Sequence, residues 1–99
     1  MSILLTRKKS AAVNSGNVKL NMRVKRGRDW EWGSQDCAAG KECVGTVISY
    51  YTIEGKRDSL PDIKFPEPIG WVYVRWDSTN KTNCYRIGAR SCYDLVTSV

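Results

Sequence analysis

The stretch GWVYVRWD, residues 70–77, constrains the fold of this chain more than any other. It is rich in β-branched and aromatic residues, which favour strands over helices. Successive side chains of a strand point to opposite faces, so every second residue belongs to one set. One set is Val72, Val74 and Trp76, and the other is Trp71, Tyr73 and Arg75. We expect the first set to fill a core and the second to lie on the outer surface.

Four further stretches carry strand signals, namely residues 20–26, 43–51, 82–88 and 93–99. They are short, they alternate or are β-branched, and turn residues separate them. Residues 54–70 contain three prolines and two glycines, which predicts one long loop. Five short strands without a helical pattern predict an all-β fold, a small closed or nearly closed barrel.

The basic residues are concentrated near the N-terminus. Residues 1–28 contain eight Lys or Arg and no acid, whereas residues 29–99 contain eight basic and ten acidic residues. The net charge of +6 therefore belongs to the leading segment. Residues 1–19 show no periodicity, so we expect a flexible basic linker or tail there and a folded domain over residues 20–99.

The composition, 41% hydrophobic and 26% charged, is that of a globular domain. No apolar run approaches the roughly 20 residues of a membrane-spanning helix. The opening MSILLTRKKS lacks the order of charges and apolar residues of a secretory signal. These features predict a cytoplasmic location, with a nuclear one left open, and no membrane partner.

Four cysteines and the absence of histidine limit the chemistry of the chain. The cysteines are Cys37, Cys43, Cys84 and Cys92, and their gaps differ from the close pairs of zinc sites. A cysteine nucleophile needs a base or a cation to lower its pKa, and no histidine is present. We expect reduced, partly buried thiols, with zinc or a disulfide as open alternatives.

The carboxylates are spread over separate segments. We expect them to accept backbone N–H groups in turns or to pair with Arg26 or Arg86. The candidates are Asp29, Asp36, Asp77 and Asp94. The sequence therefore predicts no catalytic residue, no metal ligand and no cofactor.

Five motifs occur in a fixed order over about residues 22–96: RVKRGRDWEWGSQD, VGTV, GWVYVRWD, NCYRIG and YDL. Together they resemble the Mib–Herc domain of Mind-bomb and HECT-type E3 ubiquitin ligases. The resemblance implies an SH3-like β-barrel that is itself not an enzyme. It also implies a parent E3 ubiquitin-protein ligase of the HECT or RING type. In Mind-bomb proteins such domains bind short peptide segments in the cytoplasmic tails of Notch ligands.

The aromatic residues, four Trp, five Tyr and one Phe, exceed what a core of this size can hide. Exposed Trp and Tyr beside Arg are typical of binding hot spots. We therefore predict a protein- or peptide-recognition module, and the resemblance implies that it presents a segment for ubiquitin transfer by another domain. The predicted peptide-binding residues are Trp30, Trp32, Trp71, Tyr73, Arg75, Tyr85 and Arg86. The loop at residues 54–70 is expected to rim this site.

Two other functions stay open at this point. Aromatic side chains converging near an acid would form a cage for methylated lysine, through cation–π attraction. Alternatively, the domain packs against neighbouring domains of its parent and has no free ligand. The expected partners are a peptide or protein segment and those neighbouring domains. We expect a monomeric isolated domain and no nucleic-acid partner.

Overall fold

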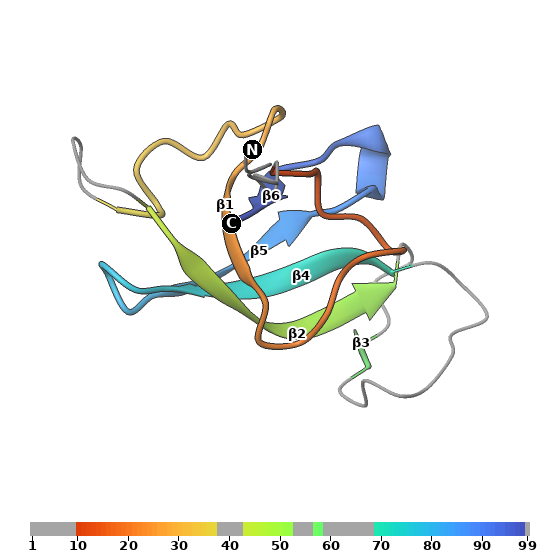
Figure 1. Cartoon of the computed structure of the whole chain (residues 1–99), viewed down its shortest axis with the longest axis horizontal. Coiled ribbons are helices and arrows are strands. Elements are labelled where there is room, and N and C mark those ends of the chain that lie inside the picture. Colours follow the sequence, from red (N-terminus) through yellow and green to blue (C-terminus); the bar gives the residue numbers. More distant parts are fainter. Residues whose placement is uncertain (1–9, 38–42, 53–56, 59–68, 99) are drawn as a thin grey trace, which may run out of the picture.

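The structure is a computed structural model that describes residues 10–37, 43–52, 57–58 and 69–98. All the strand pairings in this part are antiparallel (Figure 1). The strands are β1 (Arg23–Arg26), β2 (Gly45–Thr52), β3 (Arg57–Asp58), β4 (Ile69–Trp76), β5 (Thr82–Arg86) and β6 (Leu95–Thr97), with a short 3₁₀ turn, η1 (Ala89–Ser91). Each of the five predicted stretches overlaps one of these strands, so the all-β prediction is confirmed.

The strands form one sheet in the order β5-β4-β2-β1-β6, with the two-residue β3 added beside β2. This order is an open path, and among the described strands β5 and β6 share no ladder. One isolated bridge, between Ile87 and Tyr93, joins the segments just outside those two strands. The described ladders therefore do not close the closed or nearly closed barrel that the sequence predicts, and the observed architecture is a small antiparallel sheet.

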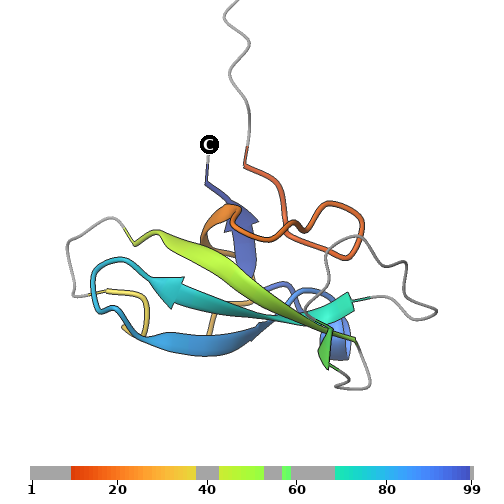
Figure 2. The same ribbon diagram turned by 90° about the horizontal axis from the view of Figure 1, so that it is seen from below.

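The core lies on one side of the layer formed by β2, β4 and β5. In β4 the alternate residues Val72, Val74 and Trp76 are buried, as the pattern predicts. Figure 2 shows β6 and the N-terminal segment on the same side of this layer. The fully buried side chains of that side include Val13, Val24 and Leu95, which pack in the same cluster. The opposite side of β4 carries Trp71, Tyr73 and Arg75.

Residues upstream of Leu20 contact the sheet in the described part of the chain. Val13 has no exposed surface, and its N–H donates to the Leu95 carbonyl at 2.9 Å. Thr97 N–H donates to the Ala11 carbonyl at 2.8 Å, so this segment runs along the edge strand β6. Backbone pairing with an edge requires no hydrophobic periodicity, which explains why the sequence did not show it. The division into residues 1–19 and 20–99 stays a prediction.

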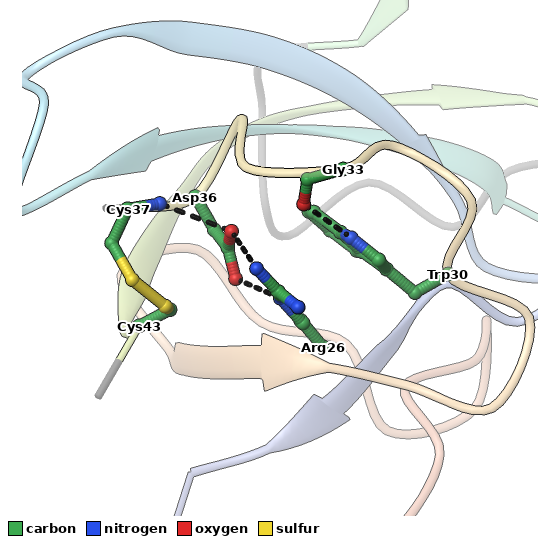
Figure 3. Close-up of a disulfide and its surroundings, with 6 residues drawn as sticks. All are labelled: Arg26, Trp30, Gly33, Asp36, Cys37 and Cys43. Carbon is green, nitrogen blue, oxygen red and sulfur yellow. Dashed lines mark hydrogen bonds and ion pairs between the residues drawn. A yellow bond between two sulfur atoms is a disulfide. The ribbon is translucent and has the colours of Figure 1, made fainter. Parts of the chain in front are cut away.

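Cys37 and Cys43 form a disulfide, with their Cα atoms 5.4 Å apart (Figure 3). The expectation of reduced thiols is wrong for this pair, because the separation of their Cα atoms is within the range of a disulfide. Cys84 and Cys92 are free and partly buried, as predicted. Most of the predicted loop at residues 54–70 lies outside the described residues; β3 and the start of β4 fall within it. The part of the chain that the structure describes contains no helix long and apolar enough to cross a membrane.

Candidate functional site

An aromatic groove lies on the outer face of β2, β4 and β5. Its lining residues are Tyr51, Trp71, Tyr73 and Cys84, around a volume of about 250 Å³. The sheet register places them together, because Tyr51 is opposite Trp71 and Tyr73 is opposite Cys84. The rings of Tyr51 and Tyr73 meet edge to face, with centroids 5.1 Å apart. All four residues are half-buried, so this groove presents apolar surface.

Two exposed arginines stand at the ends of this outer-face groove. Arg75 follows Trp71 and Tyr73 on the same face of β4. The Arg90 guanidinium lies over the Trp71 ring, 5.6 Å from its centroid. The backbone of Arg90 is left-handed, with φ 56° and ψ 26°, and Ser91 follows at φ 57°. Residues other than glycine rarely adopt this backbone conformation, which costs about 1–2 kcal/mol for each such residue. The turn η1 therefore holds Arg90 over Trp71 at a conformational cost.

Trp30, Trp32 and Tyr85 form a second aromatic cluster, which packs against the core. Trp30 stacks on Tyr85 with ring centroids 5.2 Å apart and meets Trp76 edge to face. Tyr85 has no exposed surface, and its hydroxyl accepts a hydrogen bond from Trp76 Nε1 at 2.8 Å and donates to Gln35 at 2.9 Å. Burial raises the pKa of Tyr85. This cluster therefore closes one end of the core.

The guanidinium of Arg86 is used within the domain. Its Nε and Nη2 donate to the two carboxylate oxygens of buried Asp94 at 2.9 and 2.7 Å, and Nη2 also donates to Glu31 at 2.9 Å. The same guanidinium lies over the Trp32 ring, 5.1 Å from its centroid. The Asp94 carboxylate raises the pKa of Arg86, so the charge is permanent. Arg86 therefore ties β5 to the segment before β6.

The seven predicted peptide-binding residues thus fall into two groups rather than one groove. Trp71, Tyr73 and Arg75 lie on the outer face, where the alternation in β4 predicts them. The remaining four, Trp30, Trp32, Tyr85 and Arg86, belong to the core-side cluster and its ion pair. The outer-face groove is one place among the described residues where half-buried aromatic side chains line a hollow, and Tyr93 lines another.

The aspartates hold turns and ion pairs, as the sequence predicts. Asp36 accepts from Arg26 Nη2 at 2.8 Å and from the Cys37 N–H at 3.0 Å (Figure 3). Asp29 accepts the Tyr93 N–H at 2.6 Å, which lowers the pKa of its carboxyl. The oxygens and sulfurs of Asp36, Cys37 and Cys43 lie within 4.8 Å of one another, near enough for a metal ion. The two sulfurs are bonded to each other and the Asp36 carboxylate pairs with Arg26, so these three groups already have partners other than a metal ion.

The Mib_herc2 family model matches residues 21–98. The chain belongs to the Mib_herc2 family. It is 42% identical over 80 residues to the E3 ubiquitin-protein ligase MIB2 of Gallus gallus, covering 81% of this chain and 7% of that protein. It is 34% identical over 98 residues to the E3 ubiquitin-protein ligase HERC2 of Homo sapiens, covering 91% of this chain and 2% of that protein. It is 32% identical over 94 residues to the E3 ubiquitin-protein ligase mind-bomb of Drosophila melanogaster, covering 95% of this chain and 7% of that protein.

The predicted family resemblance is therefore confirmed, and this Mib_herc2 chain spans a small fraction of the ligases that it matches. Three residues of its outer-face groove were not predicted, namely Tyr51, Cys84 and Arg90. The strand patterns contain Tyr51 and Cys84, but only the pairing register shows that they are neighbours of Trp71 and Tyr73. Burial raises the pKa of Cys84 to about 11, so its thiol is an uncharged wall of the groove.

Proposed function

We propose that this Mib_herc2 domain is a non-catalytic recognition module that binds a segment of another protein on the outer face of β2, β4 and β5. In a longer ligase it would hold that segment for ubiquitin transfer by another domain, in the cytoplasm. The names of MIB2, HERC2 and mind-bomb support the ligase context. We also propose that the strand order is that of an SH3-like barrel, since the Ile87–Tyr93 bridge brings the two ends of the strand path together.

The observation that carries this proposal is the contrast between the two aromatic groups. Trp30, Trp32 and Trp76 pack against the core, whereas Trp71 lies beside two tyrosines on a half-exposed face. Contiguous exposed aromatic surface marks interaction sites in soluble proteins. Aromatic residues and arginine are also the residues that dominate binding energy at interfaces. The outer-face groove has both.

The ionisable groups favour binding over catalysis. Asp36 and Asp94 are buried in ion pairs with arginines, and Asp29 holds a backbone N–H. A thiol with a pKa of about 11, as at Cys84, is almost entirely protonated near neutral pH and is a poor nucleophile. These side chains support the structure and leave no pair poised for proton transfer among the described residues.

The same geometry argues against a methyl-lysine cage. Such a cage requires open aromatic faces and an acid to attract the cation. Arginine guanidinium groups already lie over the faces of Trp30, Trp32 and Trp71, at 5.4, 5.1 and 5.6 Å from the ring centroids. A second cation at these rings would meet a like charge. A peptide that contacts the groove by apolar surface avoids this repulsion.

The proposal is tested by panning a random heptapeptide phage library on the immobilised 99-residue chain. Enriched peptides are then titrated into the isotope-labelled chain and followed by NMR. We expect saturable shifts at Tyr51, Trp71 and Tyr73. Trp71→Ala should weaken binding by about 2 kcal/mol, roughly thirtyfold.

Tyr93→Ala is the matched control, because it removes a half-buried aromatic side chain that lines a different surface with Ala12 and Arg28. It should bind the enriched peptides as the unmodified chain does. If panning enriches no peptide, the proposed recognition role is refuted. If enriched peptides bind Trp71→Ala as tightly as the unmodified chain, the outer-face groove is not the site.

A further inference from the structure

We infer that the segment bound in the outer-face groove carries one apolar side chain flanked by two carboxylates. This inference rests on the proposed function and adds the chemistry of the ligand. It follows from three features of the outer face: the size and lining of the groove, the positions of Arg75 and Arg90, and the pairing of nearby Asp77 with Arg23.

The groove suits a single apolar side chain. Its volume, about 250 Å³, is below the roughly 300–1,000 Å³ of cavities that enclose small-molecule ligands. Its walls are the rings of Tyr51, Trp71 and Tyr73 and the uncharged sulfur of Cys84. A leucine or phenylalanine of an extended chain would bury its surface against these rings.

The two ends of the groove are positive. Arg75 lies four positions after Trp71 on β4, about 13 Å along the strand, whereas Arg90 lies over Trp71 itself. Neither arginine forms an ion pair with an acidic side chain in the described part of the chain. Two guanidinium groups are therefore left to meet charge on a partner.

An acid that interacts electrostatically with Arg75 is already paired. Asp77 influences Arg75 electrostatically, but both of its oxygens accept hydrogen bonds from the Arg23 guanidinium. Arg23 and Asp77 thus balance one another beside the groove. Arg75 and Arg90 are therefore the two described arginines beside the groove whose charge a ligand can meet.

An extended peptide rises about 3.3 Å per residue, so carboxylates about four residues apart match the separation of the two arginines. Each carboxylate can form the paired hydrogen bonds for which a guanidinium is suited. A peptide with lysines at those positions would be repelled. The predicted pattern is therefore an acid, an apolar residue two positions later, and an acid two positions after that.

The test uses three end-blocked nonapeptides with a central leucine in a Gly/Ser frame. They carry Asp, Asn or Lys two positions before and two positions after the leucine. Each is titrated into the isotope-labelled 99-residue chain by NMR, and affinities are measured by calorimetry. We expect the Asp peptide to bind about tenfold more tightly than the Asn peptide, with shifts at Trp71 and Tyr73, and the Lys peptide not to saturate.

Arg75→Gln and Arg90→Gln should each weaken the Asp peptide about two- to fivefold, the range of exposed charge pairs. Arg90→Lys keeps the charge and should retain most of the affinity. This variant therefore distinguishes the loss of a positive charge from a structural change in η1. The control is Arg28→Gln, which removes an exposed arginine, 72% accessible, away from the groove and should leave the affinity unchanged. Raising the salt concentration should weaken the Asp peptide and leave the Asn peptide unaffected.

The outcomes separate this inference from the proposed function. If the Asn peptide binds the outer face as tightly as the Asp peptide, or if the Arg75 and Arg90 variants keep full affinity, the acidic ligand is refuted and the recognition role stands. If a single-stranded oligonucleotide binds this face more tightly than the Asp peptide, the ligand class is refuted. If neither these peptides nor any panned peptide saturates the face, both proposals fail.

Discussion

Trp71 and Trp76 lie five positions apart on β4 and face opposite sides of the sheet. An odd separation along a strand places two side chains on different faces. Trp76 has no exposed surface and hydrogen-bonds Tyr85 in the core, whereas Trp71 lines the outer-face groove. Two identical side chains on one strand therefore have different roles, one in stability and one in recognition.

Alanine substitutions should separate these two roles. Trp76→Ala leaves a large cavity in the core and should lower the free energy of unfolding by about 3–5 kcal/mol. Trp71→Ala should lower it by less than about 1.5 kcal/mol, because Trp71 is half-buried and its loss leaves no enclosed cavity. Urea unfolding followed by circular dichroism measures both. Equal losses would show that Trp71 is a core residue.

Removing Asp94 should destabilise the domain far more than removing Asp77. Asp94→Ala leaves the buried Arg86 guanidinium without its main partner and should cost about 3–5 kcal/mol. Asp77 pairs with Arg23 at the surface, where its side chain is 54% exposed, so Asp77→Ala should cost less than about 1 kcal/mol. Thermal unfolding of both variants provides the comparison. A similar cost for the two would contradict a structural role for the Arg86–Asp94 pair.

Gly45 should not tolerate a side chain. A Cβ at this position would lie 2.4 Å from Val74 Cγ1 and 2.7 Å from Trp76 Cε3, both in the core. Gly45→Ala should therefore cost about 1–3 kcal/mol through overpacking. Gly33 is the control, since its φ is 57° and its Cβ would meet nothing within 4 Å. Gly33→Asn should cost less than about 1 kcal/mol, because Asn tolerates left-handed backbone. A larger loss of stability for Gly33→Asn than for Gly45→Ala in urea unfolding would contradict the β2–β4 register.

The Asp29 carboxylate should make stability depend on acid pH. The Tyr93 N–H and Arg28 lower the pKa of Asp29 in the folded state, below the ordinary value of about 3.9. The ionised carboxylate therefore stabilises the fold above about pH 4, and this contribution is lost as the pH falls through the lowered pKa. Asp29→Asn should be less stable than the unmodified chain at neutral pH, and the difference should shrink below about pH 4. A difference that is constant from neutral to acid pH in urea unfolding would contradict this linkage.

Cys84 should react slowly with alkylating agents. Burial, and next the Asp94 charge, raise the pKa of its thiol to about 11, so little thiolate is present near pH 8. In the Cys92→Ser variant, alkylation of Cys84 by iodoacetamide should be at least about tenfold slower in the folded chain than in urea. Mass spectrometry measures the rate. Equal rates would place Cys84 at the open surface rather than in the wall of the groove.

The sequence predicted the strands well because their periodicity is local. The alternation in residues 70–77 placed Trp71 outward and Trp76 inward without knowledge of any partner strand. Tyr85 was assigned to the binding site because its face depends on its pairing with Val72, which sequence periodicity does not reveal. Trp30 and Trp32 lie in an irregular segment between β1 and β2, where no period applies, and Val13 is ordered by backbone pairing with β6. The differences between the expected and the observed positions therefore fall where long-range pairing decides the structure.

The most direct test of the account is the affinity of the Asp-flanked leucine peptide for the unmodified chain and for Trp71→Ala, measured by calorimetry under the same conditions. The account predicts saturable binding to the unmodified chain and a loss of about thirtyfold in the Trp71 variant, with the fold intact by circular dichroism. Equal affinity for the two chains, or no saturable binding to the unmodified chain, would contradict it.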